Sequence, residues 1–347
     1  MKLVTFDQGQ GSERGGIVAH DAKGPATFVI DLESGLLWLD REKGGTGQVA
    51  AVREKAGHGI LGFIEHAAVV RPLADELLAR FADGSLPVDL ARPLSSTKLL
   101  APVPRPPSMR DGYAFRQHVE TARRNRGLEM IPEFDQFPVF YFTNHQSVIG
   151  PGELLVQKRQ AERLDFELEA AVVLGKRGKN VPASRADELI FGLTIMNDFS
   201  ARVLQMDEMK LSLGPAKGKD FATGLGPWLV TLDELLPRAT KTERGLVFDL
   251  EMRATVNGVV VSRGNVRDMN WTFAQILERV TDSVWAGPGE VIGSGTCGTG
   301  CFLELNGSKI TDNQWLKVGD RIVLEIDGLG ALEHVVVAAD ESMQLGR

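Results

Sequence analysis

The sequence predicts an α+β protein, mostly β, with a small N-terminal domain over residues 1–100 and a larger domain over residues 101–347. Three observations support this prediction. Short apolar and β-branched runs dominate the chain from Gly224 onward, which is typical of strands. Residues 48–81 are rich in Ala, Leu, Glu and Arg and contain few helix breakers, which indicates helix. Six of the sixteen prolines lie between Pro87 and Pro107, which predicts an extended connector between the two parts.

The composition is that of a globular protein with a sizeable core, with 43% hydrophobic and 24% charged residues among 347. A net charge of −7 argues against nucleic-acid binding, and we interpret the short basic cluster at residues 123–126 as a solvated helix end. No apolar run approaches the roughly 18 residues that a membrane span needs, and the N-terminus lacks the apolar region of a signal peptide. The only cysteines, Cys297 and Cys301, make neither a disulfide framework nor a zinc site, so we expect a cytoplasmic protein.

The N-terminal part is predicted to consist of four short strands followed by helix. Strands are expected at residues 2–6, 16–19, 26–32 and 36–39, and helix over residues 48–81. This part contains no cluster of His, Cys or paired acids, so we expect it to have a supporting role.

Residues 164–175 are the most informative stretch, because apolar and acidic residues alternate there before an apolar run. The alternation predicts a strand. Glu167 and Glu169 then point to the same face with Cα atoms roughly 6–7 Å apart, near enough for one cation to bridge the carboxylates. Two carboxylates directed into a sheet interior would repel each other unless a cation or a proton lies between them. The alternative interpretation is a solvated strand face.

Further candidate residues precede this strand. A helix predicted over residues 111–126 would place Asp111 and His118 on one face, although Asp111 is equally typical of a helix cap. His118 lies between polar residues, which is not the pattern of a core histidine. The only two tyrosines, Tyr113 and Tyr141, flank the same region, Tyr141 within a strand expected at residues 137–142.

Downstream, residues 192–198 predict a buried strand that ends in Asp198, and a helix over residues 200–210 would place Arg202 and Gln205 on one side. Ser184 is predicted to cap a helix over residues 185–190. Further strands are expected at 228–231, 247–256, 259–262, 290–292, 302–305, 321–326 and 332–337, around a helix at 271–284.

Two familiar motifs do not fit their usual functions. Residues 293–298 have the spacing of a dinucleotide-binding fingerprint, but a strand is predicted at 302–305 where that fingerprint requires a helix. The loop from Gly214 to Lys219 resembles a phosphate-binding loop, but it is one residue short and Asp220 replaces the required Ser or Thr. The sequence also contains no nucleophile elbow of a serine hydrolase.

Glu167, Glu169 and Asp198 together form an all-oxygen, acidic set. Hard cations such as Mg²⁺ or Ca²⁺ prefer such ligands, whereas zinc and copper prefer His or Cys. The sequence therefore predicts a site for a hard divalent cation.

With these residues in place, the chain resembles the fumarylacetoacetate hydrolase family. The motifs lie in the family's order over residues 105–305, and their combination is specific although no single motif is. They are Asp111-x-Tyr113 with His118, Glu167-x-Glu169, the stretch 196–202, the loop Gly214-Pro215 to Gly218-Lys219, and Gly293-Ser294-Gly295-Thr296.

The resemblance implies a catalytic domain built as a mixed β-roll, assembled as a homodimer. It implies a divalent cation, with Mg²⁺ first and Ca²⁺ or Mn²⁺ as alternatives, held by Asp111, Glu167, Glu169 and Asp198. It also implies that His118 is the general base and that Glu304 orients it. Arg202, Gln205 and Lys219 would match donors to the oxyanion, and Tyr113, Tyr141 and Thr296 would match substrate contacts.

The activity that the resemblance implies is metal-dependent hydrolysis of a C–C bond in a 1,3-diketo acid. The substrate would be a small keto acid of the fumarylacetoacetate or acylpyruvate type, cleaved through a metal-chelated enolate and a His-activated water. The alternatives are a decarboxylase of the oxaloacetate type, an isomerase or a hydratase of the same superfamily, and a non-catalytic metal-dependent binding protein. The chain departs from the family pattern at one position. The family's hydrolase has an arginine nine residues after the histidine, and this position is Gly127 here, with Arg124 and Arg126 close by. Recognition of the distal carboxylate of the substrate is therefore open.

Overall fold

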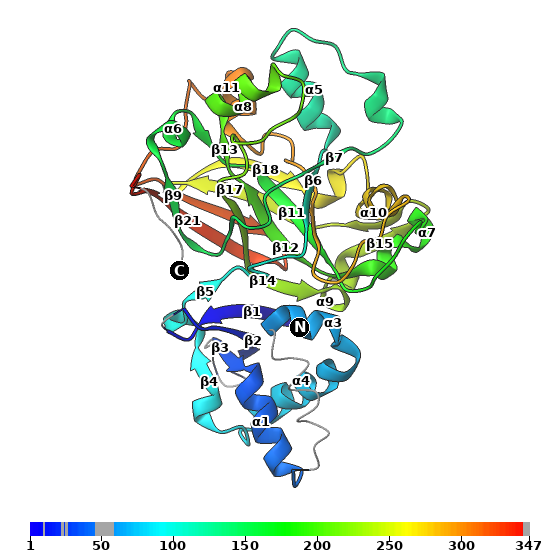
Figure 1. Cartoon of the computed structure of the whole chain (residues 1–347), viewed down its shortest axis with the longest axis vertical. Helices are drawn as coiled ribbons and strands as arrows, with labels where there is room; N and C mark the ends of the chain where they lie inside the picture. Colours follow the sequence, from blue (N-terminus) through cyan, green and yellow to red (C-terminus); the bar gives the residue numbers. More distant parts are fainter. Residues whose placement is uncertain (10, 22–23, 25–26, 46–58, 343–347) are drawn as a thin grey trace.

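The structure is a computed structural model of the chain, and it describes all residues except 10, 22–23, 25–26, 46–58 and 343–347. Two sheets dominate it, and the N-terminal elements lie together at one end of the molecule (Figure 1). Of the helices described, none combines the length and the apolar character that a membrane span requires.

Within the described residues, the N-terminal part contributes strands, three α-helices and two short 3-10 helices. The elements are β1 (Lys2–Asp7), β2 (Glu13–His20), β3 (Thr27–Asp31), β4 (Ala91–Pro93), β5 (Leu99–Leu100), α1 (Leu32–Glu42), α3 (Gly59–Glu65), α4 (Ala67–Ala82), η1 (Val88–Leu90) and η2 (Leu94–Ser96). The first three predicted strands are confirmed, except that residue 26 of the third lies outside the described residues, but the strand expected at 36–39 is wrong. Asp31 accepts a hydrogen bond from the Ser34 backbone N–H at 2.9 Å and so starts helix α1. The helix predicted over 48–81 is described only from Gly59, as α3 and α4; its earlier part lies outside the described residues.

The larger sheet runs through both parts of the chain. Its other strands are β6 (Met109–Gly112), β7 (Phe140–Phe142), β8 (Val148–Ile149), β11 (Leu168–Leu174), β12 (Ile190–Asp198), β14 (Thr223–Thr231) and β19 (Val291–Gly293). Within the described residues it has twelve strands in the order β4-β3-β2-β1-β14-β12-β11-β19-β6-β7, with β5 beside β1 and β8 beside β14. Because β1 pairs antiparallel with β14, the N-terminal strands extend the sheet that carries the acidic strand.

The second sheet has five strands among the described residues and packs against the first. It comprises β9 (Gly152–Val156), β17 (Glu251–Val256), β18 (Val259–Asn265), β20 (Arg321–Ile326) and β21 (Gly330–Ala338), in the order β18-β17-β20-β21-β9. On β11, Ala170 and Val172 join a core cluster with residues of this sheet, whereas Ala171 and Val173 join a cluster with the N-terminal helices. Strand β11 is therefore buried on both faces, which explains its continuous apolar run.

Short elements connect and flank the sheets. They are α5 (Arg116–Arg124), η3 (Pro132–Asp135), α6 (Lys158–Ala161), β10 (Leu164–Asp165), α7 (Ala183–Ala186), η4 (Asp187–Leu189), β13 (Ser200–Ala201), α8 (Arg202–Met209), α9 (Leu232–Leu235), η5 (Leu236–Arg238), β15 (Ala239–Thr242), β16 (Gly245–Phe248), η6 (Val266–Asp268), α10 (Phe273–Thr281) and α11 (Phe302–Gly307). The predicted strand at 164–175 is interrupted between β10 and β11, and the one at 247–256 is divided between β16 and β17.

Three further local predictions are wrong. Asp111 lies in strand β6, where it is opposite Tyr141 and Gly293, and the following helix begins only at Arg116. Ser184 lies inside α7, whose N-cap is Pro182. Residues 302–305 are helical because the Asp165 carboxylate accepts the first free backbone N–H groups of α11.

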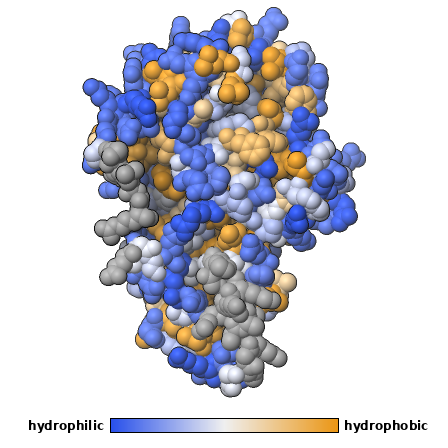
Figure 2. Space-filling view, viewed as in Figure 1, coloured by the Kyte–Doolittle hydropathy of each residue, from blue (hydrophilic) through white to orange (hydrophobic). Residues whose placement is uncertain are grey.

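Helix α11 follows residues 293–298, as a dinucleotide-binding fingerprint requires, and the strand predicted there is absent. The fingerprint still does not fit, because the Asp165 carboxylate occupies the place at the helix start that a pyrophosphate would need. At the molecular surface, hydrophilic residues cover much of the face in Figure 2, with hydrophobic residues in scattered groups between them.

Candidate active site

Four acidic side chains from three strands of the larger sheet meet in the interior. Asp111 lies on β6, Glu167 immediately before β11, Glu169 on β11, and Asp198 at the end of β12. Each offers a carboxylate oxygen, and these oxygens all lie within 4.8 Å of one another. The four residues are at most 6% exposed, so the interpretation of Glu167 and Glu169 as a solvated strand face is wrong.

The neighbouring strands leave room for this close approach. Strand β19 lies between β11 and β6, with Gly293 opposite both Ala171 and Asp111. A Cβ atom at Gly293 would collide with Asp111 Oδ1 and would lie 3.0 Å from Glu169 Oε2. Glycine at this position is therefore what allows the two acids to face each other across the sheet.

The acids differ in charge state because their surroundings differ. Burial and the nearby Asp198 raise the pKa of Asp111 to about 8. Burial and Asp111 raise the pKa of Glu169 well above its usual value. At Glu167 burial acts in the same direction, but Lys219 and Arg202 overcome it and lower the pKa to about 2. Lys219 also lowers the pKa of Asp111, but less than burial and Asp198 raise it, so the end of the cluster formed by Asp111 and Glu169 has less compensating positive charge than the end at Glu167.

The unsatisfied oxygens of the cluster fit a hard cation. Glu169 Oε2 and Asp198 Oδ1 are buried and have no hydrogen-bond partner among the residues that the structure describes. Burying an ionised oxygen without a partner is costly, and a coordinated cation removes that cost. Four carboxylates without His or Cys favour Mg²⁺, Ca²⁺ or Mn²⁺ over zinc or copper. The donor set and its geometry are thus suited to one divalent cation.

A histidine and a glutamate form a second group beside the acids. His118 on α5 and Glu304 on α11 are 7% and 2% exposed, and His118 Nδ1 lies 2.6 Å from Glu304 Oε2. This contact leaves Nε2 as the ring nitrogen that is available for another proton. The Tyr113 ring packs edge-to-face on the imidazole at 5.7 Å between centroids. His118 is among the groups that lower the pKa of Glu167, so the imidazole lies near the acidic cluster.

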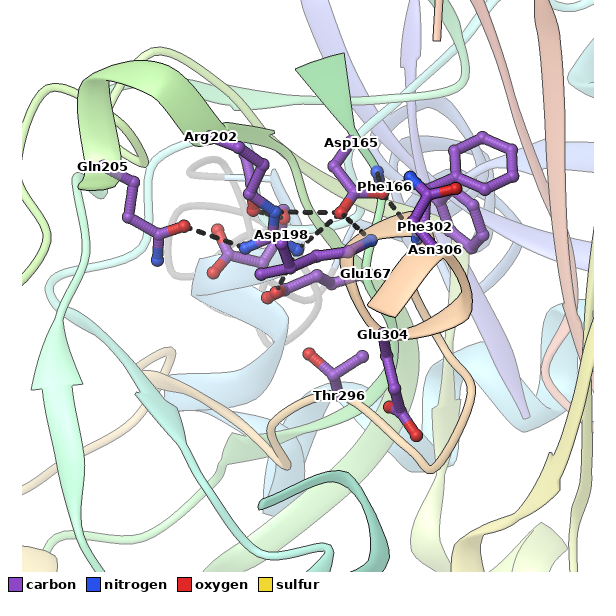
Figure 3. A network of polar contacts seen from close by, with 12 residues as sticks. Asp165, Phe166, Glu167, Asp198, Arg202, Gln205, Thr296, Phe302, Glu304 and Asn306 are labelled. Carbon is purple, nitrogen blue, oxygen red and sulfur yellow. Dashed lines mark hydrogen bonds and ion pairs between the residues drawn. The ribbon is translucent and has the colours of Figure 1, made fainter. Parts of the chain in front are cut away.

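Two basic side chains border the cluster, and Figure 3 shows one of them, Arg202, between Gln205 and Asp165. The Arg202 guanidinium donates to Asp165 through Nε at 2.8 Å, to Glu167 at 2.8 Å and to Gln205 at 2.9 Å. The Gln205 contact confirms that the two residues share one side of α8. Lys219 Nζ lies 2.5 Å from Glu167 and 2.7 Å from Asp198. Although burial opposes it, these two acids raise the pKa of Lys219, which therefore stays an ammonium ion.

The remaining predicted residues also contact the cluster. The Tyr141 hydroxyl donates to Asp198 Oδ2 at 2.5 Å, and the Thr296 hydroxyl donates to Glu169 Oε1 at 3.4 Å. The structure thus brings all twelve predicted residues into one region, although their roles stay predictions.

Sequence reasoning missed two residues that support this region. Asp165 is fully buried and joins Arg202 to helix α11. Asn197 Oδ1 accepts the Glu167 backbone N–H at 3.0 Å and so fixes the chain where β10 and β11 are interrupted. Asp165 carried a usable signal, because it precedes Glu167 with the same spacing of two that relates Glu167 to Glu169.

The family description "Fumarylacetoacetate (FAA) hydrolase C-terminal" matches residues 108–337 of this chain, which include all twelve predicted site residues. The chain belongs to the fumarylacetoacetate hydrolase family. This is a superfamily of enzymes, and its named members among the relatives include fumarylacetoacetases and oxaloacetate tautomerases.

Several relatives match more than half of the chain. An uncharacterized protein of Pyrococcus abyssi is 34% identical over 215 residues, which are 61% of this chain and 85% of that protein. Fumarylacetoacetase of Oryza sativa is 30% identical over 288 residues, covering 67% of this chain and 66% of the enzyme. The human mitochondrial oxaloacetate tautomerase FAHD2A is 31% identical over 247 residues, covering 71% of each chain.

Solved structures share the fold over nearly the whole chain. Fumarylacetoacetate hydrolase from Exiguobacterium antarcticum is 24% identical with a TM-score of 0.67, covering 97% of this chain and 99% of that one. Maleylpyruvate hydrolase from Sphingobium sp. SYK-6, in complex with manganese(II) and pyruvate, is 19% identical with a TM-score of 0.66, covering 98% and 100%. The predicted α+β, mostly β fold of this family is confirmed.

Proposed function

We propose that the protein is a metal-dependent hydrolase that cleaves a C–C bond in a 1,3-diketo acid of the fumarylacetoacetate or acylpyruvate type. The observation that carries this proposal is the buried His118–Glu304 pair beside the acidic cluster, because activation of water requires a base in that position. Relatives of about 30% identity that are fumarylacetoacetases support the same reaction.

The cation in this proposal is Mg²⁺, with Mn²⁺ or Ca²⁺ as alternatives, held by Asp111, Glu167, Glu169 and Asp198. When bound, it would supply Lewis-acid polarisation of the carbonyl oxygens of the substrate. A structure of the same fold, maleylpyruvate hydrolase, is a complex with manganese(II) and pyruvate, which supports a divalent cation and a small keto acid in this proposal.

His118 would remove a proton from the attacking water. Its Nδ1–H donates to Glu304, which fixes the tautomer and leaves Nε2 as the acceptor. The buried Glu304 carboxylate also stabilises the imidazolium that forms when the proton arrives. A positioned base of this kind accelerates proton transfer by roughly 10²–10⁴-fold. The same imidazolium can then give the proton to the carbon released when the C–C bond breaks.

Lys219 and Gln205 are the donors proposed for the oxyanion that forms at the attacked carbonyl. Lys219 keeps its charge, and one preorganised donor stabilises such an oxyanion by roughly 3–4 kcal/mol. Arg202 has a different role in this proposal, because Asp165, Glu167 and Gln205 already accept from its three nitrogens. We therefore assign Arg202 to holding Glu167 in position. Tyr113, Tyr141 and Thr296 remain the proposed substrate contacts.

Oxaloacetate tautomerisation is the second candidate. It is favoured by the human and rat oxaloacetate tautomerases, which are 31% and 29% identical over 71% of this chain. This reaction moves a proton between carbon and oxygen and consumes no water. His118 would serve as the proton carrier, and the acidic cluster would hold the same cation.

We also propose that the chain forms a homodimer and that residues 1–100 are a supporting domain. Leu211 and Leu213, which follow α8, are 81% and 94% exposed, and an interface would bury such apolar side chains. The N-terminal strands extend the sheet that carries the acids, which supports the proposal that residues 1–100 are a supporting domain. Light scattering across a concentration series measures the oligomeric state.

The deciding experiment offers acylpyruvates, fumarylacetoacetate and oxaloacetate to the protein with Mg²⁺, with Mn²⁺ and with a chelator. A hydrolase releases a carboxylic acid and a second, shorter ketone or keto acid, and the chelator abolishes the release. Loss of the enol form of oxaloacetate without cleavage would favour the tautomerase. The absence of turnover across the whole panel, with cation supplied, would contradict the enzyme function.

His118→Ala is the matching variant test. We expect kcat to fall by roughly 10²–10⁴-fold while Mn²⁺ affinity is retained, because the imidazole moves a proton and is not among the four proposed ligands. His20→Ala is the control, because His20 is an exposed histidine on β2. Full activity in His118→Ala would remove His118 from the mechanism.

A further inference from the structure

The Asp165 carboxylate uses both of its oxygens in the interior. Oδ1 accepts the backbone N–H groups of Phe302 and Phe166 at 2.8 and 3.0 Å. Oδ2 accepts the backbone N–H of Leu303 at 2.9 Å and Arg202 Nε at 2.8 Å. The side chain is 0% exposed, and Figure 3 shows it between Arg202 and the start of α11. All of its neighbours are donors, so both oxygens must be acceptors.

One side of Asp165 determines where helix α11 begins. This helix has only six residues, and its N-cap, Cys301, provides no side-chain hydrogen bond. Asp165 accepts the orphan N–H groups in its place and adds a favourable charge at the helix start. The Phe166 and Phe302 rings pack edge-to-face at 5.1 Å and reinforce the same contact. Glu304 lies in the first turn of this helix, where it meets His118.

The other side of Asp165 orients a residue of the acidic cluster. The backbone of Asp165 pairs with Ser200 in the β10–β13 ladder, and Arg202 follows directly as the first residue of α8. The Arg202 guanidinium then spans from Asp165 to Glu167, with 2.8 Å contacts to each. A carboxylate on the far side of the arginine thus fixes a proposed cation ligand.

We propose that Asp165 is a positioning residue that couples the two halves of the site, the cation ligands and the His118–Glu304 pair. It touches neither the proposed substrate nor the cation, and it acts through Arg202 on Glu167 and through α11 on Glu304. The proposal rests on the metal-dependent enzyme function proposed above. It goes beyond that function because it makes cation affinity and proton transfer depend on one buried carboxylate.

Asp165→Asn distinguishes this coupling from simple helix capping. Asn caps helices as well as Asp does, so a residue that serves only as a cap tolerates the change. Asn has the same shape but only one acceptor oxygen, so it must present an NH₂ group either to Arg202 or to the N–H groups of α11. We expect Mn²⁺ affinity and kcat at saturating Mn²⁺ each to fall by roughly 10–100-fold.

Asp187→Asn is the matched control. Asp187 is also a buried aspartate, but it lies away from the site and one oxygen, Oδ2, accepts from both Leu246 N at 3.0 Å and Lys241 Nζ at 2.5 Å. An asparagine there keeps both contacts, so both readouts should stay at the level of the unaltered protein. Thermal unfolding midpoints of the two variants, recorded alongside, separate a loss of folding from a loss of coupling.

The outcomes are decisive in either direction. Loss of both readouts in folded Asp165→Asn, with Asp187→Asn unchanged, is the predicted result. Unchanged readouts would reduce Asp165 to a helix cap, and loss of only one readout would mean that it serves one half alone; either result overturns the coupling. Failure of the unaltered protein to bind Mn²⁺ or to turn over any substrate would instead overturn the proposed function.

Hydrogen exchange on the unaltered protein tests the same link without a substitution. Coupling between two sites is reciprocal, so Mg²⁺ bound at the acids must also stabilise the start of α11. We expect added Mg²⁺ to slow exchange of the Phe302 and Leu303 amides, measured by mass spectrometry on peptides that cover 301–307. Protection around Glu167 without any change in that peptide would overturn the proposal even if Asp165→Asn fails to fold.

Discussion

Two groups of buried charges lie side by side in this protein, and they are balanced differently. Around Arg202, the carboxylates of Asp165 and Glu167 accept every donor that the guanidinium directs at them. Around Asp111 and Glu169, acids face acids, and Glu169 Oε2 has no hydrogen-bond partner among the described residues. The comparison teaches that buried charges with opposite partners serve the structure, whereas a buried cluster of like charges indicates a binding site for an ion of opposite charge.

The largest effect on stability is expected in the balanced group, which consists of Arg202, Asp165 and Glu167. Arg202→Met removes the cation that neutralises Asp165 and Glu167, and it leaves both buried carboxylates without that partner. We expect the free energy of unfolding to fall by about 3–5 kcal/mol, measured by urea denaturation in the absence of divalent cation. A loss below about 1 kcal/mol would contradict the view that this group is structural.

A third buried group, His334, is held in its neutral form at neutral pH. Burial lowers its pKa to about 4 from 6.5, and its Nε2 lies 3.1 Å from the Gly150 carbonyl oxygen. The unfolded chain therefore binds a proton below pH 6.5 that the folded protein takes up only near pH 4. Stability should decrease as pH falls through this window, by about 3 kcal/mol in total from this residue.

His334→Asn should remove this contribution. The variant's free energy of unfolding should depend less on pH between about 6.5 and 4, whatever its absolute value. Denaturation curves at a series of pH values measure the slope, and equal slopes in the two proteins would show that the histidine is not held neutral.

Glu169→Gln should change the free energy of unfolding in the opposite direction to Arg202→Met. The buried Glu169 pKa is raised by burial and by Asp111, so the cluster destabilises the cation-free protein. A neutral isostere should raise the free energy of unfolding by on the order of 1 kcal/mol. It should lower Mn²⁺ affinity by more than the roughly 10–100-fold that losing a ligand's supporting partner costs. Reduced stability together with unchanged Mn²⁺ affinity would contradict the view that the acids around Glu169 are unbalanced and bind a cation.

The smallest loss of stability is expected at an exposed ion pair. Comparing it with the Arg202 group tests whether burial, rather than charge alone, causes the large loss there. Arg71 donates two hydrogen bonds to Asp233, and both side chains are partly exposed, at 33% and 52%. Water and salt screen such a pair, so Arg71→Ala should cost less than about 1 kcal/mol. A cost as large as that of Arg202→Met would mean that burial is not what distinguishes the two pairs.

Much of the fold could be predicted because the patterns are strong and local. The alternation before β11, the β runs after Gly224 and the helix near α10 all have clear periodicity. The acids could be predicted as a cluster because two of them share one strand face and their chemistry requires a partner.

The errors arose where distant partners decide the local structure. Residues 302–305 look like a strand by composition. Asp165, which lies 137 residues before Phe302, nevertheless accepts the Phe302 and Leu303 N–H groups and so favours a helix start there. Asp111 looks like a helix cap, but pairing with β19 and β7 makes it part of a strand. Single-sequence patterns contain neither contact, so they could not reveal Asp165 as the link between the two halves of the site.

The central claim is that Asp111, Glu167, Glu169 and Asp198 bind one divalent cation beside His118. Crystals grown with Mn²⁺ and measured for its anomalous scattering test this most directly. The account predicts one strong peak within coordination distance of oxygens from these acids, with Lys219 moved from its position between Glu167 and Asp198. A saturating Mn²⁺ concentration that leaves the cluster without a peak, with Lys219 still bridging the two acids, would contradict it.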